Sequence, residues 1–302
     1  MSETNEETAS LGTNNSNWIS TVILKLDRGH CYCEEISKEI NFQMLSSVIH
    51  HILSKVEGDG IILFPAGLID VGKDKAKAYM EIVRHITPLL KKEKRNVFVC
   101  IGILGDKKDG LYGDQIALAI DKNGIQAAGK KFFLTKKENG YVTPADNYLV
   151  GEGGFPRTFA LNGVRYYLSV CYDIFGLKEG GIENKNTDVI LNLVHCFCPK
   201  GRKDMECEEK SGVSSGDSYY ARHGFGGASK KWACPVFGAA VFFGRKVPEK
   251  WPSGVMWNGG DKSTKYCNYK EISLQPTISL PLTDRFNKNI NECTDHIRIY
   301  CS

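Results

Sequence analysis

The chain has 302 residues, of which 42% are hydrophobic and 25% are charged, and its formal net charge is +4 at pH 7. This balance is typical of a globular protein, and the length suits one large domain or two modest ones. Basic and acidic residues are interleaved rather than massed, so we expect no nucleic-acid partner, and the lack of an apolar run of about 20 residues predicts no membrane span.

The N-terminal segment differs in composition from the rest of the chain. Residues 1–17 are polar and acidic with few apolar side chains, which predicts a disordered tail and no secretory signal. The eleven cysteines are irregularly spaced, so we expect reduced thiols and a cytoplasmic location. No linker, repeat or low-complexity stretch divides residues 18–302, which we therefore expect to form a single domain.

The first part of this domain predicts alternating strands and helices. Two segments have apolar residues at helical spacing, and three short apolar runs are typical of strands, two of them buried on both faces. In chain order we expect a strand at 22–26, a helix at 41–55, a strand at 60–64, a helix at 73–92 and a strand at 96–103.

Two hairpins follow, each with an Asn-Gly pair between extended runs. The first joins a strand at 115–120 to one that runs through Lys131 to Leu134, and the second ends at Cys171. Further expected elements are strands at 187–194, 236–243, 255–257 and 271–274, and a helix at 218–231 that its glycines weaken. Together these elements predict one α/β domain with mixed sheets and helices on the outside.

Cys171 stands at the end of a β-branched and aromatic strand, just before Tyr172 and Asp173. A thiol at a strand end that faces a loop has the position of a nucleophile. The alternative is a small buried apolar residue, as most free cysteines are. We expect Asp173 to hold the loop by hydrogen bonds to its backbone.

Several segments in chain order resemble the carbon–nitrogen hydrolase (nitrilase) superfamily. Cys171-Tyr172-Asp173 resembles its nucleophile elbow, and the turn at 121–124 followed by Lys131-Phe132-Phe133-Leu134 resembles its lysine strand. Glu138 with the stretch at 141–144 resembles its Glu-Tyr-x-x-Pro segment, and residues 188–191 and 220–241 also match. The resemblance spans roughly residues 20–280 and implies a four-layer α-β-β-α sandwich of nitrilase type with mixed sheets.

The resemblance also implies roles for individual residues. Cys171 is the nucleophile, Lys131 stabilises the oxyanion, and Glu138 positions Lys131 or substitutes for a missing base. Ala66 stands where the family has its catalytic glutamate, and no acidic residue occurs between residues 61 and 69. Lys131 has an alternative interpretation as a surface lysine, because Lys130 and two more lysines lie close by in the sequence.

The implied activity is the hydrolysis of a small-molecule amide or nitrile through a thioester on Cys171, with no cofactor and no metal, in a homo-oligomer such as a dimer. Without its glutamate, the chain is alternatively a catalytically silent relative that binds a small molecule or a partner. A third hypothesis, a zinc or redox protein, rests on Cys31-x-Cys33 and on Cys196-x-Cys198 beside His195.

Overall fold

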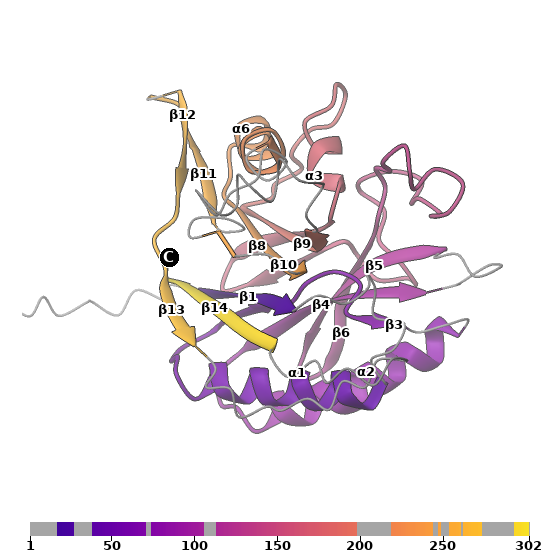
Figure 1. Ribbon diagram of the computed structural model, residues 1–302, viewed down its shortest axis with the longest axis vertical. Coiled ribbons are helices and arrows are strands. Elements are labelled where there is room, and N and C mark those ends of the chain that lie inside the picture. Colours follow the sequence, from indigo (N-terminus) through magenta and orange to yellow (C-terminus); the bar gives the residue numbers. More distant parts are fainter. Residues whose placement is uncertain are drawn as a thin grey trace, which may run out of the picture.

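A computed structural model describes residues 17–26, 38–70, 74–105, 113–197, 219–243, 247–248, 254–260, 262–273 and 293–301. Residues 1–16 of the expected tail lie outside the described residues. Within the described residues, fourteen strands form one mixed sheet that folds into two layers, and helices cover both outer faces (Figure 1). This is the α-β-β-α arrangement that the sequence predicts, with the two layers joined into one continuous sheet.

The first layer is built from the N-terminal half of the chain, in the order β6-β5-β4-β2-β1. Neighbours among β1, β2 and β4 are parallel, whereas β5 and β6 complete the layer as an antiparallel hairpin. Helices α1 and α2 cover its outer face (Figure 1). The elements are β1 (Trp18–Leu26), α1 (Lys38–Leu53), β2 (Gly60–Leu63), β3 (Ile69–Asp70), α2 (Lys75–Lys91), β4 (Val97–Gly105), β5 (Asp114–Asp121) and β6 (Gly124–Lys130).

The second layer follows in the order β10-β9-β8-β7. Its three central strands are parallel, and β7 pairs antiparallel with β8. In the described part of the chain, short helical segments cover this layer on the side away from α1 and α2 (Figure 1). The elements are β7 (Thr158–Leu161), β8 (Val164–Val170), α3 (Asp173–Gly176), β9 (Val189–Phe197), the π-helical turn η1 (Tyr220–Phe225), α6 (Gly226–Trp232) and β10 (Val236–Phe243).

Strand β1 belongs to both layers. Its first half pairs with β2 and its second half with β10, while β14 runs antiparallel along all nine of its residues. The remaining strands lie beside β10 and β14, and they are β11 (Val255–Asn258), β12 (Ser263–Tyr266), β13 (Lys270–Ser273) and β14 (Cys293–Cys301).

Three clusters of buried apolar side chains fill the spaces between the four layers. One lies between α1, α2 and the first layer, one between the two sheet layers, and one between the second layer and α3, η1 and α6. Ala66 is part of the cluster between the sheets, and Cys171 packs against both this cluster and the third. The end of the space between the sheets is therefore where the predicted site residues converge.

Two expected elements end differently in the structure. The strand expected to run to Leu134 ends at Lys130, because the backbone N–H groups of Phe132 and Phe133 bind the Asp173 carboxylate instead of a neighbouring strand. The helix expected over 218–231 begins as a π-helical turn and becomes α-helical only at Gly226.

Candidate active site

Lys131 follows directly after β6 and is fully buried. Its Nζ donates hydrogen bonds to Gln115 Oε1 at 3.0 Å and to Glu138 Oε1, with which it also forms an ion pair. Burial of a cation is costly unless it is paired and hydrogen-bonded, and both conditions are met here. The interpretation of Lys131 as a surface lysine is therefore wrong.

Glu138 reaches Lys131 from a turn seven residues further along the chain. Its Oε2 accepts a hydrogen bond from the Thr135 backbone N–H at 2.8 Å, and Gln115 Nε2 lies 3.4 Å from Oε1. Partial burial raises the pKa of the Glu138 carboxyl, but the Lys131 charge and the hydrogen bonds from Lys131 and Thr135 outweigh it, so the pKa lies below its usual value. Glu138 is therefore an ionised partner of Lys131.

Cys171 follows β8 and has a φ of 50°, in the left-handed region that residues other than glycine seldom adopt. Its backbone N–H donates to the Leu193 carbonyl at 2.7 Å, and its own carbonyl accepts hydrogen bonds from Asn192 Nδ2 and Tyr220 Oη. The turn is thus held from two other elements, β9 and η1. Cys171 as a whole residue is half-buried, and it stands at a sharp strand-to-helix turn.

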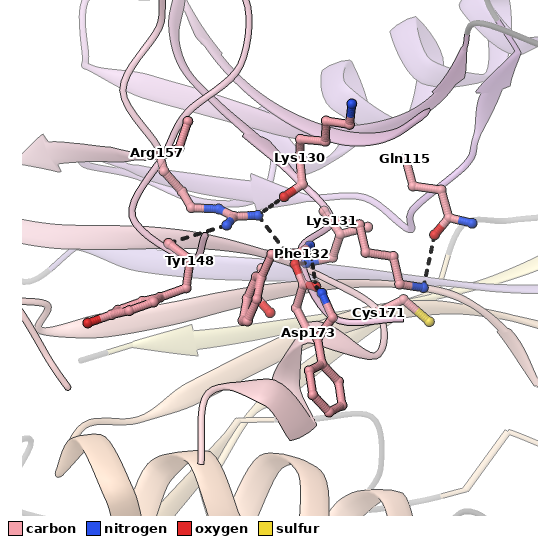
Figure 2. Close-up of polar contacts among 12 residues, drawn as sticks. Gln115, Lys130, Lys131, Phe132, Tyr148, Arg157, Cys171 and Asp173 are labelled. Atoms are coloured by element: carbon pink, nitrogen blue, oxygen red, sulfur yellow. Dashed lines mark hydrogen bonds and ion pairs between the residues drawn. The ribbon is translucent and has the colours of Figure 1, made fainter. Parts of the chain in front are cut away.

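Asp173 joins the chain after Lys131 to the turn that holds Cys171. Its Oδ1 accepts the backbone N–H groups of Phe132 and Phe133, and its Oδ2 accepts the N–H of Val170. These N–H groups belong to the residues just after Lys131 and just before Cys171, so one buried carboxylate fixes both positions. Figure 2 shows the Lys131 ammonium and the Cys171 thiol pointing the same way. The expectation that Asp173 holds the loop is confirmed.

Arg157 pairs with the Asp173 carboxylate. The two side chains are buried and form an ion pair with Nη2 and Oδ2 3.3 Å apart. The guanidinium also donates to the carbonyls of Lys130 and Tyr148, and it lies over the Phe132 ring (Figure 2). The last residue of β6 and the loop around Tyr148 are thereby joined to the same buried pair.

Ala66 lies in a turn after β2, and its backbone N–H donates to the Val194 carbonyl at 3.0 Å. Its side chain is buried in the cluster between the sheets. Lys131, which pairs with Glu138, points the same way as Cys171 (Figure 2). Cys171 packs against the cluster to which Ala66 contributes a methyl group and no carboxylate.

Sequence analysis did not assign four further residues to this site, namely Gln115, Asn192, Tyr220 and His195. Gln115 binds Lys131, whereas Asn192 and Tyr220 bind the Cys171 carbonyl. His195 was considered only as a metal ligand, and the pairing register of its strand shifts by one residue just after Leu193.

The residues that the structure describes contain no cluster of three or more His, Cys, Asp or Glu side chains that could hold zinc. Cys31, Cys33 and Cys198 lie outside the described residues. In the described part of the chain, the helices are too short or too polar to span a membrane.

No known family profile matches this chain, and no curated protein does. The fold, however, is similar to solved structures. An amidase from Nesterenkonia sp. covers 98% of this chain and 94% of its own length, with a TM-score of 0.53 and 8% identity. A double mutant of the amidase from Nesterenkonia sp. AN1 in complex with acrylamide gives a TM-score of 0.55 at 9% identity, covering 96% of this chain and 92% of its own.

A carbon–nitrogen hydrolase from Helicobacter pylori G27 is also similar, with a TM-score of 0.50 at 10% identity over 93% of this chain and 88% of its own. The Nesterenkonia amidase is described as belonging to the nitrilase superfamily. Identities this low show a shared fold and no more. The chain has the fold of the nitrilase-superfamily amidases.

Proposed function

We propose that this chain is a carbon–nitrogen hydrolase that cleaves a small-molecule amide through a thioester on Cys171. The strongest support comes from the Asp173 carboxylate, which accepts backbone N–H groups from the residue after Lys131 and from the residue before Cys171. It thereby fixes the buried lysine and the cysteine whose backbone has a left-handed conformation. An amide is preferred to a nitrile because two of the similar structures are of an amidase, one of them with acrylamide bound.

The residues supply distinct parts of this reaction. The Cys171 sulfur attacks the amide carbon, and the carbonyl oxygen becomes an oxyanion. Among the described residues, Gln115 and Glu138 accept hydrogen bonds from two of the three N–H groups of the Lys131 ammonium. The third N–H can then donate to that oxygen. A donor placed in this way typically lowers the barrier by about 3–4 kcal/mol.

The test is ammonia release from a panel of small aliphatic amides, acrylamide included. We expect the parent protein to release ammonia and Cys171→Ser to be at least about 1000-fold slower, because a serine hydroxyl is a much weaker nucleophile at neutral pH than a cysteine thiol. Cys301→Ser is the matched control, since Cys301 is exposed and lies on β14. Equal rates for the parent protein and Cys171→Ser would exclude the proposal.

Ala66 supports a second candidate, a catalytically silent protein that binds a small molecule or a partner on the same scaffold. A methyl group at this position leaves the packing between the sheets intact but accepts no proton. For this candidate, the parent protein is inactive on the whole panel while it still binds one of the amides in calorimetry. Ammonia release by the parent protein that depends on Cys171 would exclude it.

A further inference from the structure

His195 lies on β9, the strand beside β8, close to where Cys171 ends its own strand. Cys171 N–H binds the carbonyl of Leu193, two residues before His195. Leu191 and Leu193 point into the space between the two sheet layers. The pairing of β9 with β10 shifts by one residue between Leu193 and Cys196, so the direction of the His195 side chain is given by its contacts and not by the alternation of the strand.

The imidazole lies against the turn that contains Ala66. A Cβ atom placed on Gly67 would be 2.7 Å from His195 Cδ2 and 3.1 Å from Nε2. Gly67 has a φ of +65° and no side chain, which is what allows the ring edge to approach this closely. The Nε2 edge of His195 is therefore a direct neighbour of the turn where the expected carboxylate is missing.

Nε2 of His195 is buried and has no hydrogen-bond partner among the described residues. An unpaired buried polar atom is uncommon in proteins and requires an explanation, such as a functional role. Burial and the nearby Lys131 charge lower the pKa of His195 to about 3, although the Glu138 charge acts in the opposite direction. The ring is thus neutral near pH 7, and the charges that act on it are those of the candidate site.

The carboxylates of the site are already committed to other groups. Glu138 binds the Lys131 ammonium and the Thr135 N–H, and Asp173 accepts three backbone N–H groups as well as the Arg157 guanidinium. Neither has an oxygen without a donor. Hydrolysis through a thioester nevertheless requires a group that accepts the thiol proton and later a proton from water.

Resting on the function proposed above, we propose that His195 Nε2 is this proton acceptor. The Cys171 S–H bond breaks and its proton moves to Nε2, while the sulfur bonds to the amide carbon and the carbonyl electron pair moves to the oxygen. The intermediate then expels the amine, which takes the proton from Nε2. Water attacks the thioester and gives a proton to Nε2, and the departing Cys171 sulfur takes it back.

Alkylation by iodoacetamide at pH 7, with peptide mass mapping of each cysteine, tests this step without any substrate. We expect Cys171 to react at least about 10-fold more slowly in His195→Ala than in the parent protein, and added imidazole to restore the rate. His195→Asn keeps a polar side chain but accepts no proton, so we expect it to be equally slow. His50→Ala is the control, because His50 is exposed on α1.

Cys100 reports whether each variant is folded, since it is fully buried and burial raises the pKa of its thiol. Should His195→Ala expose Cys100 to the reagent, the comparison is made with His195→Asn alone. Parent-like alkylation of Cys171 in a folded His195 variant would overturn the role of His195 and leave the proposed function standing. A parent protein in which Cys171 reacts no faster than exposed Cys301 would overturn both.

Discussion

At the scale of single residues, Lys131 is a buried cation whose neutralisation depends on Glu138. The lysine side chain is fully buried, and Glu138 is 20% exposed. A buried ion pair contributes little net stability compared with apolar side chains, but removal of one partner leaves an uncompensated charge in the interior. The pair therefore fixes the geometry of the site and makes it sensitive to change.

Glu138→Gln is expected to lower the free energy of unfolding by about 3 kcal/mol, because it leaves the Lys131 charge unpaired. The midpoint of urea unfolding measures this. Glu183→Gln is the matched control, since Glu183 and Lys185 form an exposed pair with 71% and 60% of their side chains accessible. Such pairs contribute only about 0–1 kcal/mol. Equal midpoints for the two variants would contradict the importance of the buried pair.

The same pair predicts a dependence on pH. The folded-state pKa of Glu138 lies below its usual value, so its stabilising effect is present above the ordinary pKa of about 4.3 and is lost as pH falls through the folded pKa. The difference in unfolding midpoint between the parent protein and Glu138→Gln should be constant from about pH 5.5 to 7 and should shrink below pH 4. A difference that grows on acidification would contradict this assignment.

At the scale of elements, the ends of β6 and β8 are joined by side chains rather than by strand pairing. Asp173 begins α3, yet it binds backbone N–H groups on both sides of the site and the buried Arg157. Tyr220, the first residue of η1, binds the Cys171 carbonyl from a third element. Such π-helical turns are rare and occur frequently at functional sites.

Asp173→Asn should therefore be strongly destabilising. Asparagine keeps one acceptor oxygen, but its NH2 group opposes either the Val170 N–H and the Arg157 guanidinium or the N–H groups of Phe132 and Phe133. In both orientations the loss of the carboxylate charge leaves Arg157 as an unpaired buried charge. We expect a loss of about 3–5 kcal/mol in the free energy of unfolding, measured by chemical denaturation. Asp146→Asn, at an exposed position, serves as the control and should change it by less than about 0.5 kcal/mol.

Local sequence signals predicted many of these elements. Apolar runs located the buried strands, and the Asn-Gly pair at 162–163 gave a turn in which both residues have positive φ. Cys171, Lys131 and Glu138 were found because short motifs surround them. Gln115, Tyr220 and His195 were not, because each reaches the site from another element, and its position depends on a pairing register that one sequence does not reveal. Whether any of them acts in catalysis stays a prediction.

At the scale of the whole molecule, β1 and β14 hold the two layers together. Ile297 of β14 is fully buried and lies opposite Val22 of β1 in the cluster beneath α1 and α2. Sequence patterns did not predict β14, because its apolar residues Ile297 and Ile299 alternate with polar ones over only a few positions. The strand is recognised only in the structure, from its pairing with β1.

Ile297→Ala is expected to lower the free energy of unfolding by about 2–5 kcal/mol, the usual result of a cavity in a packed core. Urea unfolding followed by circular dichroism measures the loss. Met80→Ala on α2 is the control, since Met80 is 63% exposed and its truncation opens no cavity. A loss below about 1 kcal/mol for Ile297→Ala would show that β14 contributes little to holding β1 in place.

The pairing of β1 with β14 also has a consequence for biosynthesis. During translation, β1 emerges from the ribosome more than 260 residues before its antiparallel neighbour at Cys293–Cys301. One edge of β1 therefore remains open while the intervening chain is made, and an open apolar edge is a site for mispairing between nascent chains. We expect recombinant expression to benefit from slow translation at low temperature and from chaperones that shield strand edges.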